Sequence, residues 1–119
     1  VAKELGDHLP ALERLVLKGC VQLSDAAVES IAAGCPSVAE LSLNKLPGIS
    51  DAALVALRKH CTGLRTLDVS WCRGVTDHGM GALVDACAGL EKLSVWGCTQ
   101  LTRTFYDGHS ADALRVIGR

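Results

Sequence analysis

The stretch that decides the fold is Leu64-Arg-Thr-Leu-Asp-Val-Ser-Trp-Cys-Arg-Gly-Val-Thr-Asp77. Leu67 and Val69 alternate with polar residues, which predicts a short strand with one buried face. Gly74 follows as a turn residue, and Thr76-Asp77 supplies a hydroxyl for a helix N-cap and an acidic residue for the first helical turn. The stretch therefore predicts one strand, a turn and the start of a helix.

The same pattern recurs every 26 residues without insertion or deletion, and Leu12, Val38, Leu64 and Leu90 open the four copies. A lone strand–helix unit cannot bury its apolar face, so such units must stack on one another. Apolar columns mark the strands and turns, and apolar residues at helical spacing mark the helices. The strand and turn columns are Leu15, Leu41, Leu67, Leu93; Leu17, Leu43, Val69, Val95; and Leu23, Ile49, Val75, Leu101. The helix residues are Val28, Ile31, Leu54, Leu57, Met80 and Leu83.

Cys35, Cys61 and Cys87 end the expected helices at the same interval. The composite pattern over residues 9–103 is L-x-x-L-x-L-x-x-C-x-x-[LIV]-[ST]-D-x-x-[LVM]-x-x-[LI]-x-x-x-C. It resembles the cysteine-containing class of leucine-rich repeats, which occurs in F-box substrate receptors of ubiquitin ligases and their relatives. The resemblance implies a right-handed, curved α/β solenoid, with parallel strands on the concave face and helices on the convex face.

We expect a single leucine-rich-repeat domain over residues 1–119, taken from a longer protein. Residues 1–9 read as the helix of a preceding repeat, because Leu5 keeps step with Ile31. The strand of that repeat, and an unknown number of earlier repeats, would lie upstream. The regular repeats are expected at 10–35, 36–61 and 62–87, and a divergent repeat with a C-terminal cap at 88–119.

The divergent repeat differs from the three regular repeats after Thr102. Arg103 replaces the usual Asp, which is unfavourable beside a helix N-terminus. Residues 107–110 would interrupt a standard helix, and Leu114–Ile117 reads as a closing strand that comes two residues early. Terminal repeats are often atypical because they shield the open end of the core. Residues 104–112 could instead form a loop that binds a partner.

The C-terminal part carries a narrower resemblance. Ser94-Val-Trp-Gly-Cys98, Phe105-Tyr-Asp-Gly-His109 and Leu114-Arg-Val-Ile-Gly-Arg119 are similar to the end of the leucine-rich-repeat subunits of nucleotide-excision-repair complexes. That family acts in DNA-damage recognition with ubiquitin-ligase character. The resemblance implies a DNA-repair link, and it places Arg119 near a natural C-terminus.

Composition excludes several classes of protein. The net charge is −1, whereas a dedicated nucleic-acid binder usually shows a basic stripe, so no direct nucleic-acid contact is expected. No export signal or membrane-length apolar run is visible, so we expect no membrane association and an intracellular location, cytoplasmic or nuclear.

The cysteines fall into two columns and favour small buried free thiols. Leu46 stands in one column where its siblings have cysteine, and leucine can be neither a metal ligand nor a disulfide partner. No C-x₂-C pair suggests zinc, and no nucleophile or phosphate-loop motif is present, so we expect no enzyme activity, metal or cofactor. The columns are Cys20, Leu46, Cys72, Cys98 and Cys35, Cys61, Cys87.

The candidate binding surface is the strand face that points away from the core, where a protein partner is expected. Trp71 and Trp96 stand out in neighbouring repeats, with backbones expected about 5 Å apart. Exposed indoles flanked by charge suit a binding hot spot, but Trp71 could fold over its loop and Trp96 could cover the end of the solenoid. The candidate residues are Arg14, Lys18, Glu40, Asn44, Thr66, Asp68, Ser70, Trp71, Lys92, Ser94 and Trp96.

Two functions fit this reading. The first is a non-catalytic substrate-recognition or adaptor module of a ubiquitin ligase, with other ligase subunits bound through an upstream region such as an F-box. The second is a structural leucine-rich-repeat subunit of a large assembly, of ciliary or ribosomal type. Residues between the repeat anchors vary freely, so the fold alone does not separate these functions.

Overall fold

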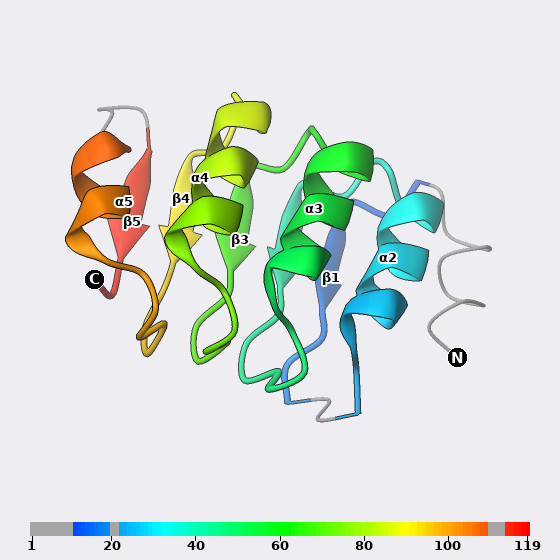
Figure 1. Ribbon diagram of the computed structural model, residues 1–119. Coiled ribbons are helices and arrows are strands. Elements are labelled where there is room, and N and C mark those ends of the chain that lie inside the picture. The colour runs from blue at the N-terminus through cyan, green and yellow to red at the C-terminus, as the bar shows by residue number, and fades with distance from the viewer. Residues whose placement is uncertain (1–10, 20–21, 110–113) are drawn as a thin grey trace.

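The computed structural model describes residues 11–19, 22–109 and 114–119. Five parallel strands form one sheet in the order β1-β2-β3-β4-β5, and the helices between them stand along one side of it (Figure 1). The predicted α/β solenoid is therefore confirmed. In chain order the elements are β1 (Arg14–Val16), α2 (Asp25–Gly34), β2 (Glu40–Ser42), α3 (Asp51–His60), β3 (Thr66–Asp68), α4 (Asp77–Ala86), β4 (Lys92–Ser94), α5 (Arg103–Gly108) and β5 (Arg115–Ile117).

The strand register matches the sequence period. Leu41 pairs with Leu67, and Leu67 pairs with Leu93, so equivalent residues of successive repeats lie side by side. These three side chains point into the core, and each is 5% exposed or less. Leu15, the member of the column on β1, is only partly buried because β1 is the first strand of the sheet. Residues 1–10 and Cys20 lie outside the described residues, so the expectations for them stay predictions.

An aspartate ladder joins the helix starts of successive repeats. The Asp25 carboxylate accepts hydrogen bonds from the Ser50 backbone N–H at 2.8 Å and from its hydroxyl at 2.6 Å. Asp51 accepts the same pair of bonds from Thr76, and Asp77 accepts them from Thr102. The sequence suggested only that these aspartates suit the helix dipole; the structure shows that each also fastens its repeat to the next one.

Thr76 differs from the predicted N-cap in its hydrogen bonding. It precedes α4 with extended backbone, but its side chain makes no capping hydrogen bond to that helix. Its hydroxyl donates to Asp51 of the preceding repeat instead. At this position the contact between repeats has replaced the local cap.

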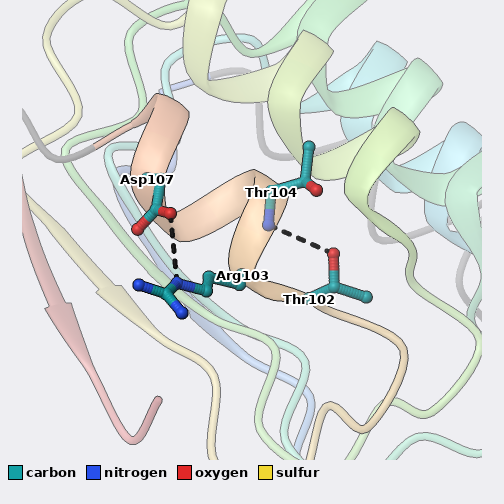
Figure 2. Close-up of polar contacts among 4 residues, drawn as sticks. All are labelled: Thr102, Arg103, Thr104 and Asp107. Atoms are coloured by element: carbon teal, nitrogen blue, oxygen red, sulfur yellow. Dashed lines mark hydrogen bonds and ion pairs between the residues drawn. The ribbon is translucent and has the colours of Figure 1, made fainter.

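The ladder stops in the last repeat, where Arg103 occupies the aspartate position. Its Nε lies 3.3 Å from Oδ2 of Asp107 one turn later, while the Thr102 hydroxyl accepts from the Thr104 N–H (Figure 2). The helix α5 has six residues where the other described helices have ten. It includes Asp107 and Gly108 and ends there, inside the segment 107–110 that was expected to interrupt a standard helix.

The closing strand β5 extends the sheet beyond β4. Leu93 of β4 pairs with Val116 of β5, an interval of 23 residues in place of the usual 26. The strand therefore comes three residues early, and the predicted shift of two residues was wrong by one. The shortened helix accounts for the smaller interval. The expected division into repeats and a C-terminal cap stays a prediction.

Five cysteines are described, and all are buried free thiols. The Cys72 Sγ donates to the Leu43 carbonyl at 2.9 Å, and the Cys98 Sγ donates to the Val69 carbonyl at 3.1 Å. These two thiols thus reach the backbone of the preceding repeat. Cysteine here is a small apolar residue that also satisfies a buried carbonyl, a role that the sequence spacing did not reveal.

We expect stability to fall as the pH rises from 9 to about 11. Burial raises the pKa of Cys61 and of Cys98 from 9.0 to about 11. In this window the unfolded thiols have lost protons that the folded thiols keep, so alkali favours unfolding. Urea midpoints at about pH 8 and about pH 10.5 measure the loss, and a Cys61→Ala, Cys98→Ala variant should lose less. An equal loss in the variant would contradict this assignment.

Candidate functional site

The candidate surface is the outward face of the five-stranded sheet, and it presents two rows of side chains in register. One row begins each strand and the other ends it, so residues of successive repeats lie one strand spacing apart, about 4.8 Å. A solvent-open groove of about 260 Å³ runs between the rows and is lined by residues of β1 to β4. The first row is Arg14, Glu40, Thr66, Lys92 and Arg115; the second is Val16, Ser42, Asp68, Ser94 and Ile117.

The first row carries charges of both signs. The Nε of Arg14 lies 3.8 Å from a carboxylate oxygen of Glu40, and both side chains are largely exposed, so this ion pair adds little to stability. Lys92 is exposed beside Arg115 of β5. Val16 adds an exposed apolar side chain in the second row. A mixed surface of this kind favours a partner with complementary charges over a uniformly charged polymer.

Three predicted site residues also hold the fold together. The Asp68 carboxylate accepts from the Asn44 side-chain amide at 3.1 Å and from the Ser70 backbone N–H at 2.9 Å. Ser70 is buried, and its hydroxyl accepts from the Trp96 backbone N–H at 3.2 Å. This network ties three repeats together at the ends of their strands. The Asp68 carboxylate therefore makes its hydrogen bonds within the chain, and it is not the free charge beside the indoles that the sequence suggested.

A residue with left-handed backbone follows each of the strands β1 to β4. The φ angles are 71° at Gly19, 59° at Lys45, 67° at Trp71 and 68° at Gly97. Residues other than glycine rarely adopt such angles, so Lys45 and Trp71 store strain. The Trp71 N–H donates to the Trp96 carbonyl at 2.6 Å, which confirms the expected side-by-side placement of these backbones. In the sequence, only the glycines at two of these four positions, Gly19 and Gly97, indicated the turn.

Each tryptophan ring lies on a glycine of the next repeat or strand. A Cβ atom at Gly97 would overlap the Trp71 ring, and one at Gly118 would lie 2.6 Å from Cγ of Trp96. Even so, 45% of Trp71 and 54% of Trp96 remain exposed. The two readings of the indoles are therefore compatible: one side of each ring packs on the chain, while about half of the residue faces solvent. Of the remaining predicted residues, Lys18 is exposed, and Ser94 is partly buried in the second row.

Replacing Gly97 with alanine is expected to destabilise the fold by about 1–3 kcal/mol, because the methyl group meets both an unfavourable φ and the Trp71 ring. Tryptophan fluorescence should shift as the ring is displaced. Gly19→Ala isolates the backbone effect, since no atom lies within 4 Å of its Cβ position. Gly63→Ala meets neither constraint and should be nearly neutral. Equal urea midpoints for all three variants would contradict the placement of the Trp71 ring.

A second hollow lies at the loop edge of the sheet. It has a volume of about 370 Å³ and is lined by Lys45, Pro47, Trp71 and Arg73. Lys45 and Pro47 belong to one repeat, and Trp71 and Arg73 occupy the equivalent positions of the next repeat. Sequence reasoning had included Trp71 and had missed the other three residues in its list of candidates.

The helix side offers one further polar cluster. His109 stacks on Phe105, and its Nε2 lies 3.3 Å from a carboxylate oxygen of Asp85, beside a hollow of about 250 Å³. Among the described residues, no group of three or more His, Cys, Asp or Glu side chains could hold a metal ion. Within the same ranges, no helix has the length and apolar character needed to cross a bilayer.

Comparisons with known proteins agree with this geometry. A family model described as Leucine Rich repeat matches residues 60–84, which covers about one repeat. A chain in the crystal structure of the Rad7 and Elc1 complex in yeast superposes with a TM-score of 0.87 at 26% identity, over 99% of this chain and 29% of that chain. The chain thus spans less than a third of that neighbour.

A second solved structure is similar in fold alone. The tropomodulin C-terminal domain of Caenorhabditis elegans superposes with a TM-score of 0.74 at 15% identity, over 99% of this chain and 80% of that chain. No curated protein matches the chain by sequence. The likenesses together support a leucine-rich-repeat solenoid.

Proposed function

We propose that the chain is a non-catalytic protein–protein interaction module that serves as the substrate-recognition or adaptor part of a ubiquitin-ligase complex, with a link to DNA repair. The observation that carries the proposal is the groove along the strand face, where four repeats present outward side chains in register. The similar yeast chain was solved in a complex of two proteins, Rad7 and Elc1. That likeness supports a role in protein assembly.

The strand face suits recognition because contacts with the neighbouring repeats fix the backbone of its strands. Parallel pairing fixes the spacing of the outward side chains, and the aspartate ladder and buried thiols fix each repeat against the next. A partner that lies across the strands can therefore contact side chains whose positions are already set, which lowers the entropy lost on binding. The opposite charges of Glu40 and of Arg14 and Lys92 would supply charge complementarity.

The ubiquitin-ligase role rests on sequence resemblance to F-box-type and repair-type repeat proteins. The C-terminal segments that carry the narrower resemblance form the last residue of β4 with the turn after it, the C-terminal part of α5, and β5. We propose that this chain holds a protein substrate while other subunits, bound through upstream sequence, carry out the transfer chemistry.

The test is affinity capture from native extract with the full-length parent protein. A Glu40→Lys, Lys92→Glu variant reverses the charge pattern of the strand face without changing the net charge. The matched control, Glu29→Lys with Arg58→Glu, makes the same exchange on the exposed helix surface. We expect ligase or repair subunits in all captures, and one further partner lost only with the strand-face variant.

Two results would oppose the proposal. Capture of a large structural assembly, unchanged by the strand-face variant, would favour the scaffold function instead. Loss of the partner with the helix-surface control alone would move the binding site to the other side of the solenoid.

A further inference from the structure

We propose that the hollow formed by Lys45, Pro47, Trp71 and Arg73 binds an acidic linear segment of a partner protein that carries an aromatic or apolar side chain. These four residues are called the edge site below. The inference rests on the proposed protein-binding function and names the chemistry of one partner segment. It adds a location, since the edge site lies in the loops beyond the strands and outside the strand-face groove.

The shape of the edge site is set by two successive repeats. The left-handed backbone at Lys45 and Trp71 turns the chain sharply at equivalent points. The Lys45 N–H donates to the Ser70 carbonyl at 2.9 Å, and the Gln100 side-chain amide donates to the Arg73 carbonyl at 2.7 Å. These bonds fix both loops against their neighbours. The hollow of about 370 Å³ is within the size range of small-molecule and peptide side-chain pockets.

The edge site carries two positive charges that form no ion pair with the described residues. Lys45 and Arg73 are exposed, and neither forms an ion pair with any described residue. No carboxylate lines the hollow. The nearby Asp68 is occupied by Asn44 and the Ser70 N–H. Carboxylates of a partner would therefore meet two cations that the chain itself leaves unsatisfied, and the Arg73 guanidinium can hold a carboxylate with two parallel bonds.

The apolar part of the edge site is preorganised. Gly97 supports one side of the Trp71 ring, because any Cβ there would overlap it, and 45% of the residue stays exposed. Pro47 supplies a second rigid apolar wall. An indole already held in place loses little freedom when it contacts a partner side chain, which is why tryptophan and arginine dominate binding hot spots.

A protein segment fits the edge site better than a nucleic acid does. A single nucleic-acid strand needs a continuous basic groove with aromatic side chains along it. At the opposite ends of the strands from the edge site, Glu40 lies next to Arg14, and the Arg65 Nε lies 3.8 Å from a carboxylate oxygen of Glu91. Acidic side chains thus interrupt a basic track that would run from the edge site across the strand face, whereas a short acidic peptide needs only the two cations and the indole.

The test is selection of binders from a random peptide display library with the full 119-residue chain as bait. We expect enriched peptides to place Asp or Glu beside an aromatic or large apolar residue. The most enriched peptide, made with a fluorescent label, is then titrated with the chain. A Lys45→Glu, Arg73→Glu variant should bind it about 10–100-fold more weakly. The control Arg58→Glu, Lys59→Glu makes the same charge change on α3 and should bind normally.

Three results would overturn the inference. Enriched peptides could lack acidic residues, the edge-site variant could bind as well as the unaltered chain, or labelled oligo(dT) could bind the edge site more tightly than the peptide. Circular dichroism of each variant shows whether a loss of binding reflects a loss of fold. Trp71→Gly removes the indole and relieves the left-handed strain, so it provides a second variant that should weaken peptide binding.

The two proposals fail in different ways. Peptides whose binding survives Lys45→Glu, Arg73→Glu but is lost with Glu40→Lys, Lys92→Glu would refute the edge site and support the strand face as the interaction surface. Binding lost with the edge-site variant, together with capture of a structural assembly by the full-length protein, would support the edge site and oppose the ubiquitin-ligase role.

Discussion

Replacing Leu67 with alanine is expected to lower the free energy of unfolding by about 2–5 kcal/mol. Leu67 lies at the centre of β3, has no exposed surface, and pairs with Leu41 on one side and Leu93 on the other. Its side chain contributes to the continuous apolar column between the sheet and the helices. Removing it leaves a cavity between two repeats that are each fixed by their own contacts, so little collapse can fill the space.

Urea denaturation of the variants measures this effect. Leu15→Ala removes the same side chain from the partly buried end of the column and should cost less. Val16→Ala changes an exposed apolar residue on the outward face and should stay within about 0.5 kcal/mol of the unaltered chain. A loss below about 1 kcal/mol for Leu67→Ala would mean that the column is not the core of the solenoid.

Replacing Asp51 with alanine is expected to lower the free energy of unfolding by about 2–4 kcal/mol. The substitution removes two hydrogen bonds to a carboxylate, leaves the Thr76 N–H without its acceptor, and takes a negative charge from the N-terminus of α3. A Cβ at Gly79 would overlap the Asp51 carboxylate. The absence of a side chain there gives the carboxylate room to reach the next repeat.

Asp77→Ala provides the matched comparison for this prediction. Asp77 makes the equivalent bonds to Thr102, but at the more exposed last step of the ladder. Water can replace part of what is lost there, so the expected cost is smaller, about 1–2 kcal/mol. Thermal unfolding of both variants checks the order. If Asp77→Ala proved as costly as Asp51→Ala, helix-dipole and capping effects common to both positions would account for the role of the aspartates.

The strands and their register were predictable because one physical requirement repeats along the chain. Leu41, Leu67 and Leu93 each face the same apolar layer, and a slip of one residue would turn every one of them outward. The regular interval between them therefore specified the parallel pairing. The same argument failed by one residue for β5, because the place where α5 ends depends on local residues that do not repeat.

The candidate surface could be predicted only in part. Alternation along each strand placed Arg14, Glu40, Thr66 and Lys92 outward, as the structure has them. Spacing could not show that Asp68 turns back to Asn44 and Ser70, nor that Lys45 and Arg73 join Trp71 around one hollow. These contacts depend on how side chains of adjacent repeats share the loop edge.

The sequence by itself determined the solenoid, the register of β1 to β4, and the columns of apolar residues and thiols that are buried among the described residues. Each of these follows from the burial of apolar residues at a fixed interval, which is encoded within a single repeat. Only the tertiary structure decided that Asp25, Asp51 and Asp77 fasten one repeat to the next, and that each indole lies on a glycine of the next repeat or strand. Such contacts join residues about 25 positions apart whose distance is fixed only once the repeats have stacked.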